Sequence, residues 1–128
     1  MPDLTDILSE ISEAVRAVRN APSIAFGLAN PPSSSGVYLI SVENEVTYIG
    51  KAKGSGGLRD RLLNKHLSGD DNHAIQRAYL ADFPDRQLRR EHIRSTVFVR
   101  WVEIIDHHVA AAVERVLICL YHPIWNND

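Results

Sequence analysis

The chain has 128 residues, 45% of them hydrophobic, and a formal net charge of −2 at pH 7, which predicts one compact domain with enough apolar chain for a core. A single cysteine excludes an intramolecular disulfide and any multi-cysteine zinc site, and it suits a reducing cytoplasm. No apolar stretch approaches membrane length and the N-terminus lacks a basic-then-apolar signal pattern, so we expect a cytoplasmic protein without a membrane partner.

The first predicted element is an amphipathic helix that ends before Pro22. Its apolar stripe consists of Leu4, Ile7, Leu8, Ile11, Val15 and Val18. Such a row must be covered, either by its own domain or by a second copy of the chain, and we favour a homodimer because two-fold pairing is the commonest oligomeric arrangement. A proline-containing linker follows over residues 21–35, so we assign residues 1–30 to the helix and linker and residues 31–128 to the main domain.

A β-hairpin is predicted next, because residues 37–42 and 46–49 are rich in β-branched and aromatic side chains. Residues 43–45 form the expected three-residue turn. This pairing places Tyr38 and Tyr48 on the same face of the sheet. Two phenols on one face are, taken alone, more typical of sheet packing than of a functional pair.

The remaining elements follow in a simple order. A glycine-rich stretch over residues 54–57 ends the second strand, and leucines at helical spacing then predict a helix on which Arg61 and Lys65 share a face. We expect further helices from Asp71 or Asn72 to Tyr79, from Pro84 to His92 and from Asp106 to Tyr121, with a third strand over residues 96–104. The predicted fold is α+β: a small three-stranded antiparallel sheet flanked by helices (β-β-α-α-β-α) with an extra N-terminal helix.

Charge is distributed unevenly along the chain. Five basic residues face one acid between Lys51 and Lys65, and five arginines face one acid between Arg86 and Arg100. Local basic stripes of this kind are the electrostatic footprint of proteins that bind a phosphate backbone. The second stripe fits scattered surface arginines equally well.

Glu114 interrupts a predicted helix that is apolar nearly all round from Val109 to Tyr121. Burying an unpaired carboxylate is costly, so we expect Glu114 to meet a cation. That cation is either a metal ion or an arginine, with Arg61 and Arg115 as the candidates. Mg²⁺ suits a single carboxylate because this ion keeps much of its hydration shell.

Three short motifs carry a resemblance to a known family. Gly36-Val37-Tyr38, Tyr48-Ile49-Gly50-Lys51 and Leu58-Arg59-Asp60-Arg61 resemble the signature of the GIY-YIG nuclease superfamily, whose members are divalent-metal-dependent phosphodiesterases. Glu114 and Asn126 stand where that family has a metal-binding glutamate and a late asparagine. The resemblance covers about residues 36–126.

The resemblance implies a metal-dependent DNA endonuclease that uses Mg²⁺ or Mn²⁺. The catalytic residues that it implies are Tyr38, Tyr48, Lys51, Arg61, Glu114 and Asn126. Tyr38 would lie beside the attacking water as general base or relay, with Lys51 favouring its phenolate, and Glu114 would hold the metal ion. The implied DNA-binding residues are Lys51, Lys53, Arg59, Lys65 and His66.

Two departures from the family pattern affect these assignments. The glycine-rich stretch lengthens the loop before the helix, so Arg59 competes with Arg61 for the family arginine, and we prefer Arg61 for its spacing from Leu58. The family often has a histidine about one turn after that arginine; here Lys65 takes that place, so we expect His66 to be a surface or capping residue.

Two other functions stay open at this point. The same basic face would serve a catalytically silent nucleic-acid-binding module, and the N-terminal helix would serve a structural partner protein. The glycine-rich stretch is either a flexible connector or a loop that contacts DNA. For a nuclease, we expect duplex or branched DNA, selected weakly or by its structure.

Overall fold

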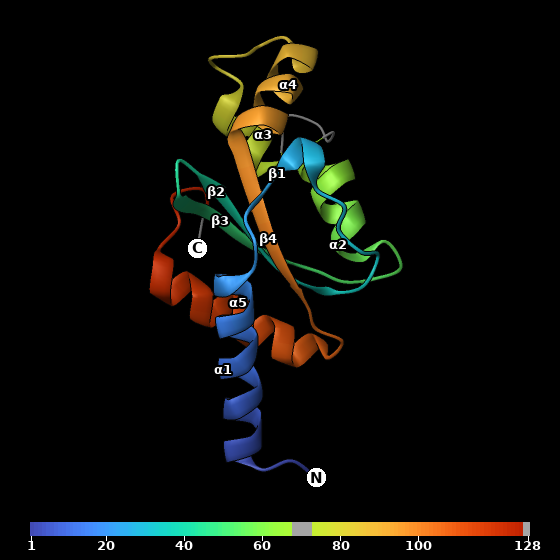
Figure 1. Ribbon diagram of the computed structural model, residues 1–128, viewed down its shortest axis with the longest axis vertical. Helices are drawn as coiled ribbons and strands as arrows, with labels where there is room; N and C mark the ends of the chain where they lie inside the picture. Colours follow the sequence, from blue (N-terminus) through green and yellow to red (C-terminus); the bar gives the residue numbers. More distant parts are fainter. Residues whose placement is uncertain (68–72, 127–128) are drawn as a thin grey trace.

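The computed structural model describes residues 1–67 and 73–126. A four-stranded antiparallel sheet, in the order β1-β4-β2-β3, lies between two layers of helices (Figure 1). The strands are β1 (Ile24–Ala25), β2 (Gly36–Val42), β3 (Glu45–Ala52) and β4 (Val97–Glu103). The predicted α+β class and the helix-flanked antiparallel sheet are confirmed. The fourth strand, β1, comes from the predicted linker, where Ile24 and Ala25 pair with β4.

The β2–β3 hairpin differs from its prediction in two ways that compensate. Its turn has two residues, Glu43 and Asn44, whose positive φ angles of 53° and 65° are those that a tight hairpin turn requires. Thr47 is an extra residue on β3, since Ile40 pairs with Tyr48 while the next pair skips one position. With the two-residue turn alone, Tyr48 would point to the face opposite Tyr38. The bulge at Thr47 shifts the register by one residue and returns Tyr48 to the face of Tyr38.

Each face of the sheet has its own helical layer and its own core. The helices α1 (Leu4–Asn20) and α5 (His107–Tyr121) cover one face, where Val37 and Leu39 of β2 point. The helical segments that pack on the other face, where Tyr38 and Ile40 point, are η1 (Phe26–Leu28), α2 (Gly57–Arg59), η2 (Asp60–Leu67), α3 (Ala74–Tyr79) and α4 (Arg86–Thr96). β2 is therefore buried on both faces, with its side chains alternating between the two cores.

The starts of α4 and α5 follow local capping chemistry. Asp106, the predicted start of α5, accepts hydrogen bonds from two backbone amides of its first turn, and Asp85 caps α4 by accepting from the Leu88 amide. His73 is the residue before α3. The helix start predicted at Asp71 or Asn72 lies outside the described residues.

The apolar sequence of α5 favoured a buried helix, and this expectation is wrong for one side of it. One side of the helix faces solvent, where Val116 is 38% and Leu120 is 52% exposed. Apolar residues make up a large share of normal protein surface, so an apolar sequence alone does not establish burial. Glu114 lies between the buried and exposed sides and is partly exposed.

Only the C-terminal half of α1 is covered by the rest of the chain. Val18 is fully buried against α5 and the sheet, whereas Leu4 and Leu8 are 72% and 56% exposed. Arg19 contributes to this docking, because its Nε donates a hydrogen bond to the Tyr121 hydroxyl. The apolar stripe of α1 thus packs partly on its own domain. The homodimer that we favoured is not supported by this arrangement. In the described part of the chain, no helix combines the length and apolar character needed to cross a bilayer.

Val18→Ala tests whether α1 docks on its own domain. We expect the free energy of unfolding to fall by about 2 kcal/mol, because the change removes buried methyl groups and leaves a cavity. Leu8→Ala is the control on the same stripe, and we expect it to change stability little because Leu8 is exposed. Urea unfolding of the full chain measures both values. Equal effects of the two substitutions would contradict the docking.

Candidate active site

Two tyrosines and a histidine form a cluster on the η2 side of the sheet. The Tyr38 hydroxyl lies 2.6 Å from His66 Nε2, and the Tyr48 ring centroid lies 5.2 Å from that of His66 and 6.3 Å from that of Tyr38. Tyr38 is fully buried and His66 is only 2% exposed. The prediction that His66 is a surface or capping residue is therefore wrong, and its burial prevents direct contact with DNA.

The position of His66 follows from the unusual geometry of η2. This segment is a π-helix, in which backbone hydrogen bonds join residues five apart. Arg61 and His66 are five residues apart and so lie on the same side, whereas regular α-helical spacing would give that place to Lys65. Arg61 contacts the hydroxyls of Tyr38 and Tyr48, and Lys65 is exposed. His66 stands one residue after the position where the family pattern places a histidine, and the π-helix brings its side chain to the side of Arg61 where that histidine is expected.

Gly50 provides the room that Tyr38 needs. The two residues are paired across β2 and β3, and a Cβ atom at position 50 would overlap the hydroxyl end of the Tyr38 ring. Glycine at this position therefore allows the tyrosine to lie flat over the neighbouring strand.

Arg59 and Arg61 point to different surroundings. The helix begins at Gly57, whose φ is +53°, and the Leu58 and Arg59 amides donate to the carbonyls of Ser34 and Pro32. The Arg59 side chain turns the same way and donates a 2.6 Å hydrogen bond to Asn30 Oδ1. Arg61 instead reaches the tyrosine cluster, so the geometry favours Arg61 over Arg59 for a role beside the tyrosines.

A cavity of about 360 Å³ opens beside this cluster, along the edge strand β3. Its lining residues come from β3, from the start of the α2–η2 helix and from α5: Tyr48, Gly50, Lys51, Ala52, Lys53, Gly57, Asp60, Arg61 and Glu114. Four of the six predicted catalytic side chains therefore share one cavity. Tyr38 lies directly behind it, next to Gly50, and Asn126 lies farther along β3.

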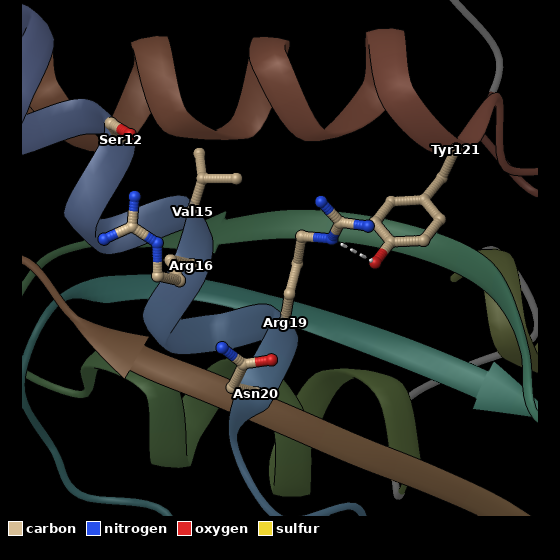
Figure 2. A pocket seen from close by; sticks show the side chains of 6 residues that line it. All are labelled: Ser12, Val15, Arg16, Arg19, Asn20 and Tyr121. Carbon is tan, nitrogen blue, oxygen red and sulfur yellow. Dashed lines mark hydrogen bonds between the residues drawn. The ribbon is translucent and has the colours of Figure 1, made fainter.

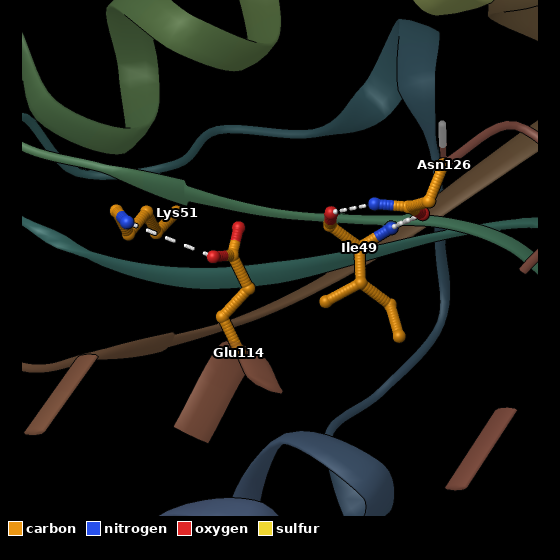
Figure 3. A network of polar contacts seen from close by, with 4 residues as sticks. All are labelled: Ile49, Lys51, Glu114 and Asn126. Carbon is orange, nitrogen blue, oxygen red and sulfur yellow. Dashed lines mark hydrogen bonds and ion pairs between the residues drawn. The ribbon is translucent and has the colours of Figure 1, made fainter. Parts of the chain in front are cut away.

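Glu114 meets the cation Lys51, which is not among the partners expected from the sequence, namely a metal ion, Arg61 or Arg115. Lys51 Nζ lies 3.7 Å from Glu114 Oε1, longer than a direct hydrogen bond (Figure 3). The Glu114 side chain is 22% exposed, so water reaches it. Within residues 1–67 and 73–126, no three or more His, Cys, Asp or Glu side chains gather as a metal-binding group. One loosely paired, hydrated carboxylate fits Mg²⁺, which binds proteins through one or two carboxylates and keeps several waters.

Asn126 forms hydrogen bonds with the outer edge of β3 near the cavity. Its Oδ1 accepts a 2.9 Å hydrogen bond from the Ile49 amide, and its Nδ2 donates a 2.9 Å bond to the Ile49 carbonyl (Figure 3). The Trp125 amide donates to the carbonyl of Thr47 on the same edge. Asn126 therefore bonds β3 as a neighbouring strand would, and its contact with this strand is to the backbone of Ile49.

Burial keeps both members of the Tyr38–His66 pair neutral. Burial, together with the nearby Tyr48, raises the pKa of Tyr38 well above its ordinary value, and the opposing hydrogen bond from Arg61 does not offset this. The expected phenolate, favoured by Lys51, is therefore not the state of this residue. Burial also lowers the pKa of His66 to about 3, with Arg61 and His73 adding to the effect. A neutral phenol and a neutral imidazole at 2.6 Å form a contact through which a proton can pass.

Two of the five arginines between positions 86 and 100 have structural partners. Arg89 is fully buried, and its Nε and Nη1 donate to Gln76 and to the Phe83 carbonyl. Arg100 donates to the carbonyl of Arg19. These two side chains serve packing, so fewer than five arginines of this segment remain for a basic surface.

A second cavity, of about 470 Å³, lies between α1 and α5 on the opposite side of the sheet from the tyrosines (Figure 2). The Arg19 guanidinium extends across it and lies 5.5 Å from the centroid of the Tyr121 ring, besides its hydrogen bond to the hydroxyl. Arg19 is thus already engaged in holding the two helices together.

Comparison with known proteins identifies the fold. The family model described as the GIY-YIG catalytic domain matches residues 34–127. Two solved structures are of the GIY-YIG N-terminal endonuclease domain of UvrC from Thermotoga maritima, each a tyrosine-to-phenylalanine mutant bound to its catalytic divalent cation. One is 21% identical with a TM-score of 0.52 and covers 80% of this chain and 91% of that chain; the other is 17% identical with a TM-score of 0.51 and covers 90% and 97%. No curated protein matches the chain.

The buried neutral His66 predicts how stability depends on pH. The unfolded chain protonates this ring below its ordinary pKa of 6.5, whereas the folded chain does so only near pH 3. The unfolded state therefore binds the extra proton in this window, and His66 lowers the free energy of unfolding as the pH falls from 6.5 towards 3. This loss approaches about 1.4 kcal/mol per pH unit.

His66→Gln keeps a neutral hydrogen-bonding side chain at this position and removes the titration. We expect its free energy of unfolding to fall less steeply than that of the wild type between pH 6.5 and 4, measured by urea unfolding at each pH. His107→Gln is the control, because His107 is exposed, and its curve should run parallel to the wild type. A His66→Gln curve that also runs parallel would show that the buried ring is not the titrating group.

Proposed function

This chain belongs to the GIY-YIG catalytic domain family, and we propose that it is a divalent-metal-dependent DNA endonuclease that hydrolyses phosphodiester bonds. The observation that carries the proposal is the shared cavity of Tyr48, Lys51, Arg61 and Glu114 in front of the buried Tyr38–His66 pair. Together these groups offer what phosphodiester hydrolysis requires: a route for the water's proton, positive charge beside the phosphate and a carboxylate for a metal ion.

The two tyrosines have different roles toward the attacking water, because Tyr48 lines the cavity and Tyr38 is buried behind it. Tyr48 lines the cavity and orients the water or the phosphate. Tyr38 lies one layer deeper and acts as a relay: its oxygen accepts the proton that leaves the water, while its own proton passes to His66 Nε2. Because burial disfavours a charged imidazole, His66 holds that proton only while the phosphate bond breaks, and then returns it through Tyr38 to water in the cavity.

The charged side chains act on the phosphate. Arg61 stabilises the charge that develops on its oxygens, and Lys51 supports it from β3. Glu114 would hold a divalent ion such as Mg²⁺ or Mn²⁺, which when bound polarises the phosphate and neutralises the leaving oxygen. Asn126 keeps β3, and with it Lys51, in register through its two bonds to Ile49.

The DNA backbone would follow the basic rim of the cavity. Lys53 lines the cavity and Lys65 is exposed on η2, so both are free to approach phosphates, and Arg59 is exposed beside Asn30. Such contacts recognise the backbone rather than base sequence, which supports duplex or branched DNA as the substrate. The exposed Cys119 suits the reducing cytoplasm that we expected.

Glu114→Gln tests the enzymatic proposal. We expect Mg²⁺-dependent cleavage of plasmid and branched DNA to fall roughly a hundredfold or more, because the uncharged amide holds a divalent ion poorly. DNA binding in gel-shift assays should survive. Glu13→Gln, an exposed position on α1, is the matched control and should cleave at the wild-type rate. Wild-type protein that binds DNA without cutting it under any metal condition would favour the catalytically silent module.

Arg61→Ala and Arg59→Ala separate charge stabilisation from backbone binding. We expect Arg61→Ala to lower kcat by two to three orders of magnitude, roughly the cost of losing one electrostatic donor. Arg59→Ala should leave kcat nearly unchanged, weaken DNA binding and reduce the slope of its salt dependence by about one. Steady-state cleavage and binding titrations at several salt concentrations measure these effects. The reverse pattern would assign the family role to Arg59.

A further inference from the structure

Behind His66, two fully buried polar side chains form a continuous chain of hydrogen bonds. Gln76 of α3 donates from Nε2 to the carbonyl oxygens of His66, at 2.7 Å, and Leu67, at 2.8 Å. Arg89 of α4 donates from Nε to Gln76 Oε1 at 2.7 Å, and from Nη1 to the Phe83 carbonyl at 3.0 Å. Gln76 and Arg89 are each 0% exposed.

This chain of bonds fixes the amide of Gln76 in one orientation. Both amide hydrogens are used by the two carbonyls, and the amide oxygen accepts from Arg89. The reversed orientation would point the amide oxygen at two carbonyl oxygens and its hydrogens at a guanidinium. Arg89, anchored in turn at the Phe83 carbonyl, therefore sets the direction in which Gln76 donates.

The carbonyls that Gln76 binds belong to the last turn of the π-helix η2, which ends at Leu67. The final carbonyls of any helix lack partners within it, and a buried carbonyl without a partner is costly. A π-helix is also rare in comparison with the α-helix, to which this segment would revert if nothing held its wider turn. Gln76 supplies the missing partners at the residue whose side chain contacts Tyr38.

We propose that Gln76 and Arg89 are positioning residues that hold the backbone of His66, and thereby hold its ring at the Tyr38 hydroxyl. The catalytic consequence rests on the proposed nuclease function, but the geometric part does not. If the two residues only stabilised the fold, their loss would lower stability and leave the His66–Tyr38 contact intact in the folded molecules.

The first test observes the ring directly, in the ¹⁵N-labelled full chain by NMR of the imidazole nitrogens. Gln76→Glu is the informative variant, because the carboxylate keeps a partner for Arg89 and cannot donate to the two carbonyls. We expect the His66 ring nitrogen signals to shift away from their wild-type values. Gln87→Glu makes the same chemical change at an exposed position of α4 and should leave them unchanged. Unchanged His66 signals in folded Gln76→Glu would overturn the proposal.

Arg89→Lys serves as the second variant and keeps the proposal testable if Gln76→Glu fails to fold. It retains the positive charge but cannot bridge Gln76 and Phe83 with a fixed guanidinium. We expect a shift of the His66 signals in the same direction as in Gln76→Glu. Wild-type signals in this variant, with the fold intact, would remove Arg89 from the positioning role.

The second test is a double-mutant cycle on DNA cleavage. We expect Gln76→Glu to lower kcat by about tenfold to a hundredfold, as for residues that orient a functional side chain, with KM and DNA affinity unchanged. In a His66→Ala background the same substitution should cause no further loss, because the ring that it positions is absent. Losses that multiply would overturn the proposal. If the wild type does not cleave DNA, the proposed function fails, and the NMR experiment still decides the positioning role.

Discussion

The hydrogen bond between the Tyr38 hydroxyl and His66 Nε2 is the contact on which the arrangement of the site depends. It joins the central strand of the sheet to the helix that crosses it, in a place that water does not reach. Tyr38 fits only because Gly50 has no side chain. His66 reaches the Tyr38 hydroxyl only because η2 has the wider turn of a π-helix. The burial that keeps both groups neutral also makes their contact strong, since a local environment of low polarity favours hydrogen bonding.

Two irregularities, a one-residue β-bulge and a π-helix, adapt regular secondary structure to this site. The bulge at Thr47 returns Tyr48 to the face of Tyr38, and the π-helical turn brings His66 to the side of Arg61. Without the first, the tyrosines would lie on opposite faces; without the second, a lysine would stand beside the phenol. Both irregularities lie where side chains must meet, which is where such features concentrate in proteins.

Sequence patterns predicted the hairpin and the helices, because these follow from regular periods of two and 3.6 residues. The side chains expected at the cavity came instead from the resemblance to the GIY-YIG family. His66 was misplaced because its position depends on a break in that period, which tertiary partners stabilise. Gln76 and Arg89 were not recognised, since nothing in a local pattern marks a buried glutamine or separates a buried arginine from a surface one. The exposed side of α5 was missed for the converse reason, that apolar residues also occur in water.

The bonds from Asn126 and Trp125 to β3 have a consequence for solubility. An uncovered edge strand offers its backbone to strands of other molecules and so promotes aggregation. Trp125 and Asn126 bind the outward-facing backbone groups of Thr47 and Ile49 on this edge. Lys51 is the next residue of β3 whose backbone groups face outward. The part of the edge at Lys51 lies in the cavity, beside charged side chains that oppose sheet-to-sheet association. One edge of one strand therefore combines an accessible site for substrate with protection against self-association.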